Sequence, residues 1–183
     1  MPVYFLFMEA HIELEYKVMI DEGVYNRMLD FYHLEPVRQV NYYYSTNKPF
    51  HAMRIREREG HFIFTLKVKE NNYHREYEFE IANNDISDPK VEELLNMFHI
   101  RKAEYIGSMT TYRAVLDFEK GELCIDKSEY LDKTDYEIEY ELKDAKIDDF
   151  STFESVLANF GIKYSPCQKS KFKRFIDALE EKQ

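Results

Sequence analysis

The stretch HIELEYKVMI, residues 11–20, decides the fold, because its side chains alternate between two chemical characters along its whole length. One set of alternate positions is mostly charged: His11, Glu13, Glu15, Lys17 and Met19. The other set is apolar: Ile12, Leu14, Tyr16, Val18 and Ile20. A period of two is typical of a β-strand, whose successive side chains point to opposite faces. The stretch therefore predicts a strand with one charged face and one apolar face.

The same alternation returns along most of the chain. It is found over residues 40–44, 53–58, 62–69, 74–81, 109–118, 122–126 and 136–142. Turn-forming pairs separate some of these segments, among them Glu59-Gly60 and Lys120-Gly121. Short strands joined by tight turns favour an antiparallel meander of about eight strands.

Four amphipathic helices are predicted between and after the strands, over residues 21–34, 89–98, 149–160 and 170–181. Apolar strand faces need cover, and these helices can supply it. The charged faces would then turn toward one another. The predicted fold is α+β: an eight-stranded antiparallel β-barrel, or tunnel, with a charged interior and helices outside. We expect a single domain over residues 8–183, with residues 1–7 as an N-terminal extension ahead of a second start at Met8.

The polar faces of the predicted strands carry charge of both signs in strand after strand. The charged residues are Glu13, Glu15, Lys17, Arg54, Arg56, Arg58, Lys67, Lys69, Glu76, Glu78, Glu80, Arg113, Asp126, Glu137, Glu139 and Glu141. Residues two apart on a strand lie about 6.5–7 Å apart, so two carboxylates can share a cation and two basic side chains can bracket a phosphate. One such strand is usually a solvated surface, but unpaired buried charge is costly, and repetition favours a site. The pattern predicts a binding site for a highly charged anion with metal.

Composition excludes several classes of protein. The net charge of −10 and the pI near 5.1 argue against a nucleic-acid coat. Cys124 and Cys167 are far apart and in no CxxC spacing, which favours reduced thiols and a cytoplasmic location. The longest apolar run, residues 3–8, is too short to span a bilayer. No membrane or nucleic-acid partner is expected.

The charged motifs, taken in chain order, resemble those of the CYTH superfamily, the triphosphate tunnel metalloenzymes. Glu13-Leu14-Glu15-Tyr16-Lys17 is similar to the ExExK signature of that family. Further segments match in order: Met53-Arg54-Ile55-Arg56-Glu57, Thr65-Leu66-Lys67-Val68-Lys69, Thr110-Thr111-Tyr112-Arg113, Tyr136-Glu137-Ile138-Glu139-Tyr140-Glu141 and Lys169-Ser170-Lys171. The resemblance implies an eight-stranded tunnel that holds a triphosphate.

The resemblance also implies a role for each charged strand. The metal ligands would be Glu13, Glu15, Glu137 and Glu139, and carboxylates suit Mg²⁺ or Mn²⁺. The triphosphate would be bound by Lys17, Arg54, Arg56, Lys67, Lys69, Arg113 and Lys171. The catalytic set would be Glu13, Glu15, Lys17, Arg113, Glu76 and Glu78, with either of the last two holding a water.

The predicted activity is hydrolysis of the terminal phosphate of a small triphosphate by in-line attack of water activated by Mg²⁺ or Mn²⁺. Inorganic tripolyphosphate, thiamine triphosphate and nucleoside triphosphates share the moiety that such a site would recognise. Two alternatives stay open: an adenylate cyclase of the class IV type, and a non-catalytic polyphosphate or nucleotide sensor. A sensor would signal through exposed aromatics, including Tyr42-Tyr43-Tyr44. Many stand-alone members of the family form dimers, which leaves a homodimer open.

Overall fold

The structure is a computed structural model that describes residues 9–48, 51–70, 73–144, 146–167 and 169–182, with strand assignment alone for residues 9–13, 70 and 73. The chain forms two compact units. Unit 1 comprises Met1–Ile12 and Gln39–Met109, and unit 2 comprises Glu13–Arg38 and Thr110–Gln183. The single domain over residues 8–183 stays a prediction, and the extension of residues 1–7 lies outside the described part.

The strands follow one hydrogen-bonded order, β1-β6-β5-β4-β3-β7-β8-β9-β2. Their bounds are β1 (Glu9–Glu13), β2 (Glu15–Ile20), β3 (Val37–Thr46), β4 (His51–Arg58), β5 (His61–Glu70), β6 (Tyr73–Ile81), β7 (Ala103–Asp117), β8 (Gly121–Tyr130) and β9 (Lys133–Leu142). The strand predicted across residues 11–19 is interrupted at Leu14, so β1 pairs with β6 while β2 pairs with β9. The interruption explains why the order holds nine strands where about eight are predicted.

Unit 1 buries the apolar face of β4, β5 and β6 under α2 (Pro89–Met97). The core residues from these elements include Met53, Ile55, Phe64, Leu66, Val91 and Leu94. The helix begins as predicted, with the Asp88 side chain accepting a hydrogen bond from the Lys90 backbone N–H at 2.8 Å. The predicted turn at Glu59-Gly60 has φ of 52° and 83°, as in the two-residue hairpins that match strand twist.

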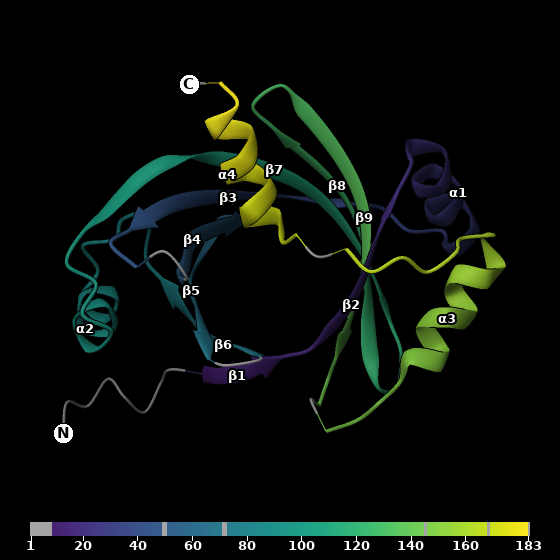
Figure 1. Cartoon of the computed structure of the whole chain (residues 1–183), viewed down its shortest axis with the longest axis horizontal. Helices are drawn as coiled ribbons and strands as arrows, with labels where there is room; N and C mark the ends of the chain where they lie inside the picture. Colours follow the sequence, from purple (N-terminus) through teal and green to yellow (C-terminus); the bar gives the residue numbers. More distant parts are fainter. Residues whose placement is uncertain (1–8, 49–50, 71–72, 145, 168, 183) are drawn as a thin grey trace. The chain divides into compact units, whose positions relative to one another are not determined.

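Unit 2 buries the apolar face of its strands under α1 (Glu22–Tyr32) and α3 (Phe150–Asn159). These two helices lie on the same side of β8 and β9 (Figure 1). The core residues shared by helices and strands include Val24, Met28, Leu123, Ile125, Ile138, Tyr140, Phe153 and Leu157. Gly161, with φ of 68°, follows the end of α3 as expected for a helix C-terminus.

The last helix, α4 (Lys171–Glu180), differs from the other three in the strand face that it contacts. It lies on the opposite side of β8 and β9 from α1 and α3 (Figure 1). Its Lys171 and Arg174 side chains form ion pairs with carboxylates on the charged face of β8 and β9. Among the described residues, no helix has the length and apolar character needed to cross a membrane.

The tyrosine run on β3 is not an exposed surface, and the sequence-based interpretation of these residues as exposed aromatics is wrong. Tyr43 and Tyr44 are buried, with exposed fractions of 2% and 7%. Tyr42 and Tyr44 pack against the apolar core of unit 1, while the Tyr43 hydroxyl donates to the Met109 sulfur at 3.7 Å. Both faces of this strand are covered, so alternation alone does not show which aromatics reach solvent.

We expect Gly121→Ala to destabilise the protein by about 1–3 kcal/mol, the usual range for overpacking a core. Gly121 opens β8, and an added Cβ would lie 2.6 Å from a ring carbon of the fully buried Tyr140. Urea unfolding would measure the loss of free energy. Glu119→Ala, an exposed change in the same turn, is the control. Equal stability of Gly121→Ala and wild type would contradict the close approach.

Candidate functional site

The strand register of unit 2 brings residues from four strands together on one charged face. β2 pairs with β9 so that Lys17 lies opposite Glu139. β8 pairs with β9 so that Asp126 lies opposite Glu137, and β7 pairs with β8 so that Arg113 lies opposite Asp126. Residues directly opposite on antiparallel strands have Cβ atoms about 4.5–5.5 Å apart, close enough for ion pairs.

Arg113 is the centre of an ion-pair network on this face. Its guanidinium donates two hydrogen bonds to the Asp126 carboxylate, with Nε–Oδ1 at 2.9 Å and Nη2–Oδ2 at 2.7 Å. Nη2 also donates to Glu139 Oε2 at 2.6 Å, and Nη1 lies 3.4 Å from Glu141 Oε1. Asp126 has no exposed surface. A planar fork of donors suits such multiple carboxylate contacts, which fixes the positions of all three acids.

Lysines from two different elements complete the network. Lys17 Nζ lies 2.7 Å from Glu15 Oε1 and 3.2 Å from Glu139 Oε1. Lys171, at the start of α4, places Nζ 2.8 Å from Glu139 Oε1 and 2.9 Å from Asp126 Oδ2. Glu139 therefore contacts three cationic side chains at once.

The pKa shifts follow from this crowding of opposite charges. Burial alone would raise the pKa of the Glu139 carboxyl, but Lys171, Lys17 and Arg113 hold it well below its ordinary 4.5. Burial also opposes the charged form of Asp126, yet Arg113 and Lys171 keep its pKa below 3.8. Burial would lower the pKa of the Lys17 ammonium, which the adjacent carboxylates raise instead. All of these groups are therefore charged at neutral pH.

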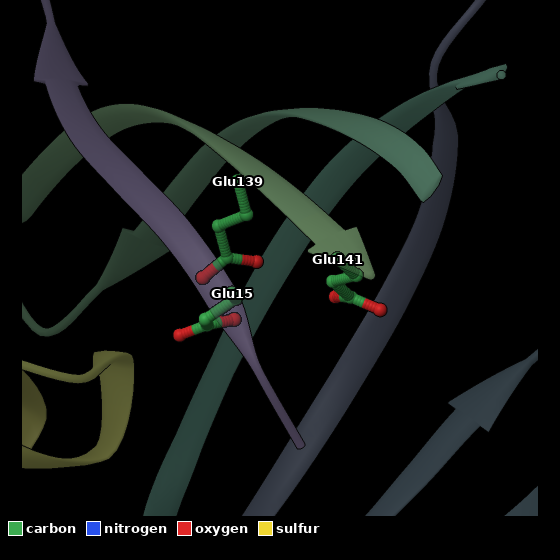
Figure 2. Close-up of side chains that lie close together, drawn as sticks. All are labelled: Glu15, Glu139 and Glu141. Atoms are coloured by element: carbon green, nitrogen blue, oxygen red, sulfur yellow. The ribbon is translucent and has the colours of Figure 1, made fainter. Parts of the chain in front are cut away.

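Two overlapping groups of carboxylates have the size of a metal site. One is Glu15, Glu139 and Glu141, and the other is Asp126, Glu137 and Glu139. Within each group the ligand oxygens lie within 4.8 Å of one another. Figure 2 shows the first group, with Glu15 on β2 and the other two on β9, and with the three carboxylates directed to a common region. Glu139 belongs to both groups.

Glu137 provides an observation that tests whether a metal fits. Its side chain is only 1% exposed, and Oε2 has no hydrogen-bond partner among the described residues. Lys171 Nζ contacts Oε1, and Arg174 Nη2 lies 2.9 Å from it, so both cationic partners gather on one of the two oxygens. A buried carboxylate in this state costs free energy unless a further partner binds it. A buried carboxylate oxygen that lacks a hydrogen-bond donor is a suitable ligand for Mg²⁺ or Mn²⁺.

Unit 1 carries a charged face in which basic side chains predominate. Arg54 Nη2 lies 3.4 Å from Glu76 Oε1, and Lys67 Nζ lies 4.0 Å from the same oxygen. Thr65 donates to Glu78 Oε2 at 3.2 Å, and Arg54 Nε lies 3.4 Å from Thr65 Oγ1. We call this set, completed by Arg56 and Lys69, the basic face of unit 1.

The site residues predicted from the sequence fall into these two sets. In unit 2 the network joins Glu15, Lys17, Arg113, Glu137, Glu139 and Lys171. In unit 1 the contacts join Arg54, Lys67 and Glu76 directly and reach Glu78 through Thr65, while Arg56 Nε donates to Asn41 Oδ1 at 3.0 Å. Lys69 is exposed near the end of β5. Glu13 ends β1, and its side chain lies outside the described part.

Sequence reasoning did not include Asp126, Glu141 or Arg174 among the site residues. Asp126 lies opposite Arg113 because the turn residues are Glu119 and Lys120, whereas counting outward from the predicted turn at Lys120-Gly121 would place Ser128 there. Glu141 is the third acid of a strand whose first two were chosen. No sequence pattern marked Arg174 as a site residue, because its partners Asp135 and Glu137 lie 39 and 37 positions away on β9.

An antiparallel fold whose charged faces carry carboxylates in one unit and basic side chains in the other matches the features of a class of proteins that bind a polyanion with cations. Comparison with family models assigns the chain to one family of that class. The CYTH domain model matches residues 11–176, and the chain belongs to the CYTH domain family. The fold class predicted from the sequence is thereby confirmed.

Relatives of known sequence or structure support the same assignment. The "Putative triphosphatase YjbK" of Bacillus subtilis is 30% identical over 186 residues, covering 93% of this chain and 97% of that protein. A Bacillus halodurans structure described as a "putative adenylate cyclase" has a TM-score of 0.78 and 29% identity, covering 91% of this chain and 98% of that one. A "putative adenylyl cyclase" of Hippeastrum with "a dominant triphosphatase activity" shares the fold, with a TM-score of 0.72, 20% identity, and coverage of 91% and 96%.

Proposed function

We propose that this CYTH protein is a divalent-metal-dependent triphosphatase that hydrolyses the terminal phosphate of a small triphosphate. The observation that carries the proposal is the pair of overlapping carboxylate groups in unit 2, which share Glu139 and have oxygens within 4.8 Å of one another. Carboxylates in that arrangement can coordinate a divalent cation, and a triphosphate binds divalent cations as well. The triphosphatase name of a relative 30% identical over nearly the whole chain supports the same reaction.

The metal ligands in this proposal come from β2, β8 and β9. Glu15, Glu137 and Glu139 are the predicted ligands that the structure describes, Asp126 joins them, and Glu13 is retained from the sequence. A cation held there would supply a Lewis acid that withdraws charge from phosphate oxygens. The ion pairs of Arg113 and Lys17 would keep the acids in position before a cation binds.

The phosphate ligands in this proposal are retained from the sequence as two sets, one in each unit. In unit 1, Arg54 and Arg56 offer forked donors, and Lys67 and Lys69 offer point charges. In unit 2, Lys17, Arg113 and Lys171 would become available once a triphosphate competes for their carboxylate partners. Glu76 and Glu78 are the acids of the basic face of unit 1, and we propose that one of them orients the attacking water.

The proposal predicts phosphate release from at least one of inorganic tripolyphosphate, thiamine triphosphate and ATP, in Mg²⁺ or Mn²⁺. Assay of the purified protein against each substrate with each metal, and with EDTA as the control, would measure it. Release in metal that stops in EDTA is the expected result. Cyclic AMP formed from ATP would instead show a cyclase, as the name of the Bacillus halodurans relative suggests. Tight tripolyphosphate binding without turnover would show a sensor.

A further inference from the structure

The ammonium of Lys171 lies where three buried carboxylates of unit 2 converge. Its Nζ is 2.9 Å from Asp126 Oδ2 and 2.8 Å from Glu139 Oε1, and it also contacts Glu137 Oε1. These three acids are the second of the two groups whose spacing suits a metal. Their exposed fractions are 0%, 5% and 1% respectively, so water cannot neutralise them well.

A divalent cation in this group would need the space that the ammonium occupies. Mg²⁺ binds oxygen at about 2.0–2.1 Å, so opposite ligands lie about 4 Å apart, within the spread of these three acids. A group that contacts all three oxygens sits between them, where such a cation would sit. Two cations cannot share that position, because both volume and charge forbid it. Lys171 and a metal therefore compete for the same carboxylates.

Lys171 is placed so that it can leave. It is the first residue of α4, where the helix dipole is positive and a cation is disfavoured. Ser170 caps the helix, and Phe175 and Ala178 are buried further along it. Arg174, one turn later, lies 2.8 Å from Asp135 Oδ2 and 2.9 Å from Glu137 Oε1. These contacts hold α4 independently of the Lys171 side chain.

We propose that Lys171 is an internal cation that occupies the Asp126, Glu137 and Glu139 group until a triphosphate draws it away, which makes metal binding at this group dependent on triphosphate. The inference rests on the proposed function. Metal alone must expel the ammonium into water and leave it without an anionic partner. A triphosphate supplies that partner, so the two ligands favour each other's binding, and the coupling is reciprocal.

The first test compares the Mn²⁺ affinity of wild type with that of two variants, in the absence of any phosphate. Binding is measured as loss of the free Mn²⁺ signal in electron paramagnetic resonance. Lys171→Met should bind Mn²⁺ about 5- to 150-fold more tightly than wild type, the usual range for coupled sites. Lys173→Met is the matched control, because Lys173 is exposed on the same helix and pairs with Asp177. Its Mn²⁺ affinity should equal that of wild type. Unchanged affinity in Lys171→Met would overturn the inference.

A second measurement on the wild-type protein keeps the inference testable if Lys171→Met folds poorly. Mn²⁺ at saturating concentration should displace the Lys171 ammonium, so that labelling of Lys171 by an amine-modifying reagent, measured by mass spectrometry, becomes faster while labelling of the exposed Lys173 stays unchanged. Labelling of Lys171 that is unchanged by saturating Mn²⁺ would overturn the inference. If wild type releases phosphate in Mn²⁺ but either measurement fails, only this inference falls. If no triphosphate is hydrolysed in any metal, the proposed function falls instead.

Discussion

Glu139→Gln should lower metal-dependent phosphate release by at least about a hundredfold, because several kcal/mol of charge stabilisation depends on a cation held in place. Glu139 belongs to both carboxylate groups. It also contacts Lys17, Arg113 and Lys171, so it fixes these side chains as well as any metal. Glutamine keeps the size of the side chain and loses the charge. Initial rates of phosphate release in Mg²⁺ would measure the effect.

The Glu139 experiment needs a control for folding, because a buried partner of three cations is removed. Circular dichroism at the assay temperature would show that the variant is folded. Glu129→Gln is the matched activity control, since the Glu129 side chain is 41% exposed and pairs with Lys127 at 2.7 Å. A folded Glu139→Gln variant with wild-type activity would contradict the assignment of Glu139 as a metal ligand.

The strands and their two faces could be predicted from the sequence because both follow from local chemistry. Alternation with a period of two is a property of neighbouring residues, and it places Lys17 and Glu139 on charged faces without knowledge of the partners. Helix starts were equally local, as Asp88-Pro89 shows. The family motifs added the order of the charged strands. Together these signals led to most members of the unit 2 network.

Features that depend on distant partners could not be predicted. Leu14 does not break the alternation, yet the strand is interrupted at this residue, with β1 before it paired to β6 and β2 after it paired to β9. The apolar stripe of α4 indicated a cover for an apolar sheet face. Lys171 and Arg174 contribute to the position of α4 as well as its apolar stripe, and their carboxylate partners are distant in sequence. Register was similarly needed to find Asp126.

Arg113→Met should destabilise the protein by about 3–5 kcal/mol, the cost of removing one partner of a buried ion pair, because among the described contacts Asp126 would keep only the Lys171 ammonium. Asp126 has no exposed surface, and its carboxylate accepts two hydrogen bonds from the Arg113 guanidinium. Asp126→Asn should also destabilise, while the double variant should lose less than the two single losses added together. Urea unfolding of the four proteins gives this coupling. Lys133→Met, which breaks an exposed pair with Glu181, should cost about 0–1 kcal/mol.

The penalty of Arg113→Met should depend on pH in a direction that the Asp126 pKa sets. Arg113 helps to hold that pKa below 3.8, so the stabilisation is complete above the unfolded value and is lost as pH falls through the folded value. In Arg113→Met the pKa of Asp126 rises, and at low pH the acid is protonated and needs no cationic partner. The free-energy difference from wild type should therefore be full at about pH 7 and smaller at about pH 3. A difference that stays constant over this range would show that Arg113 stabilises through packing of its side chain and not through its charge.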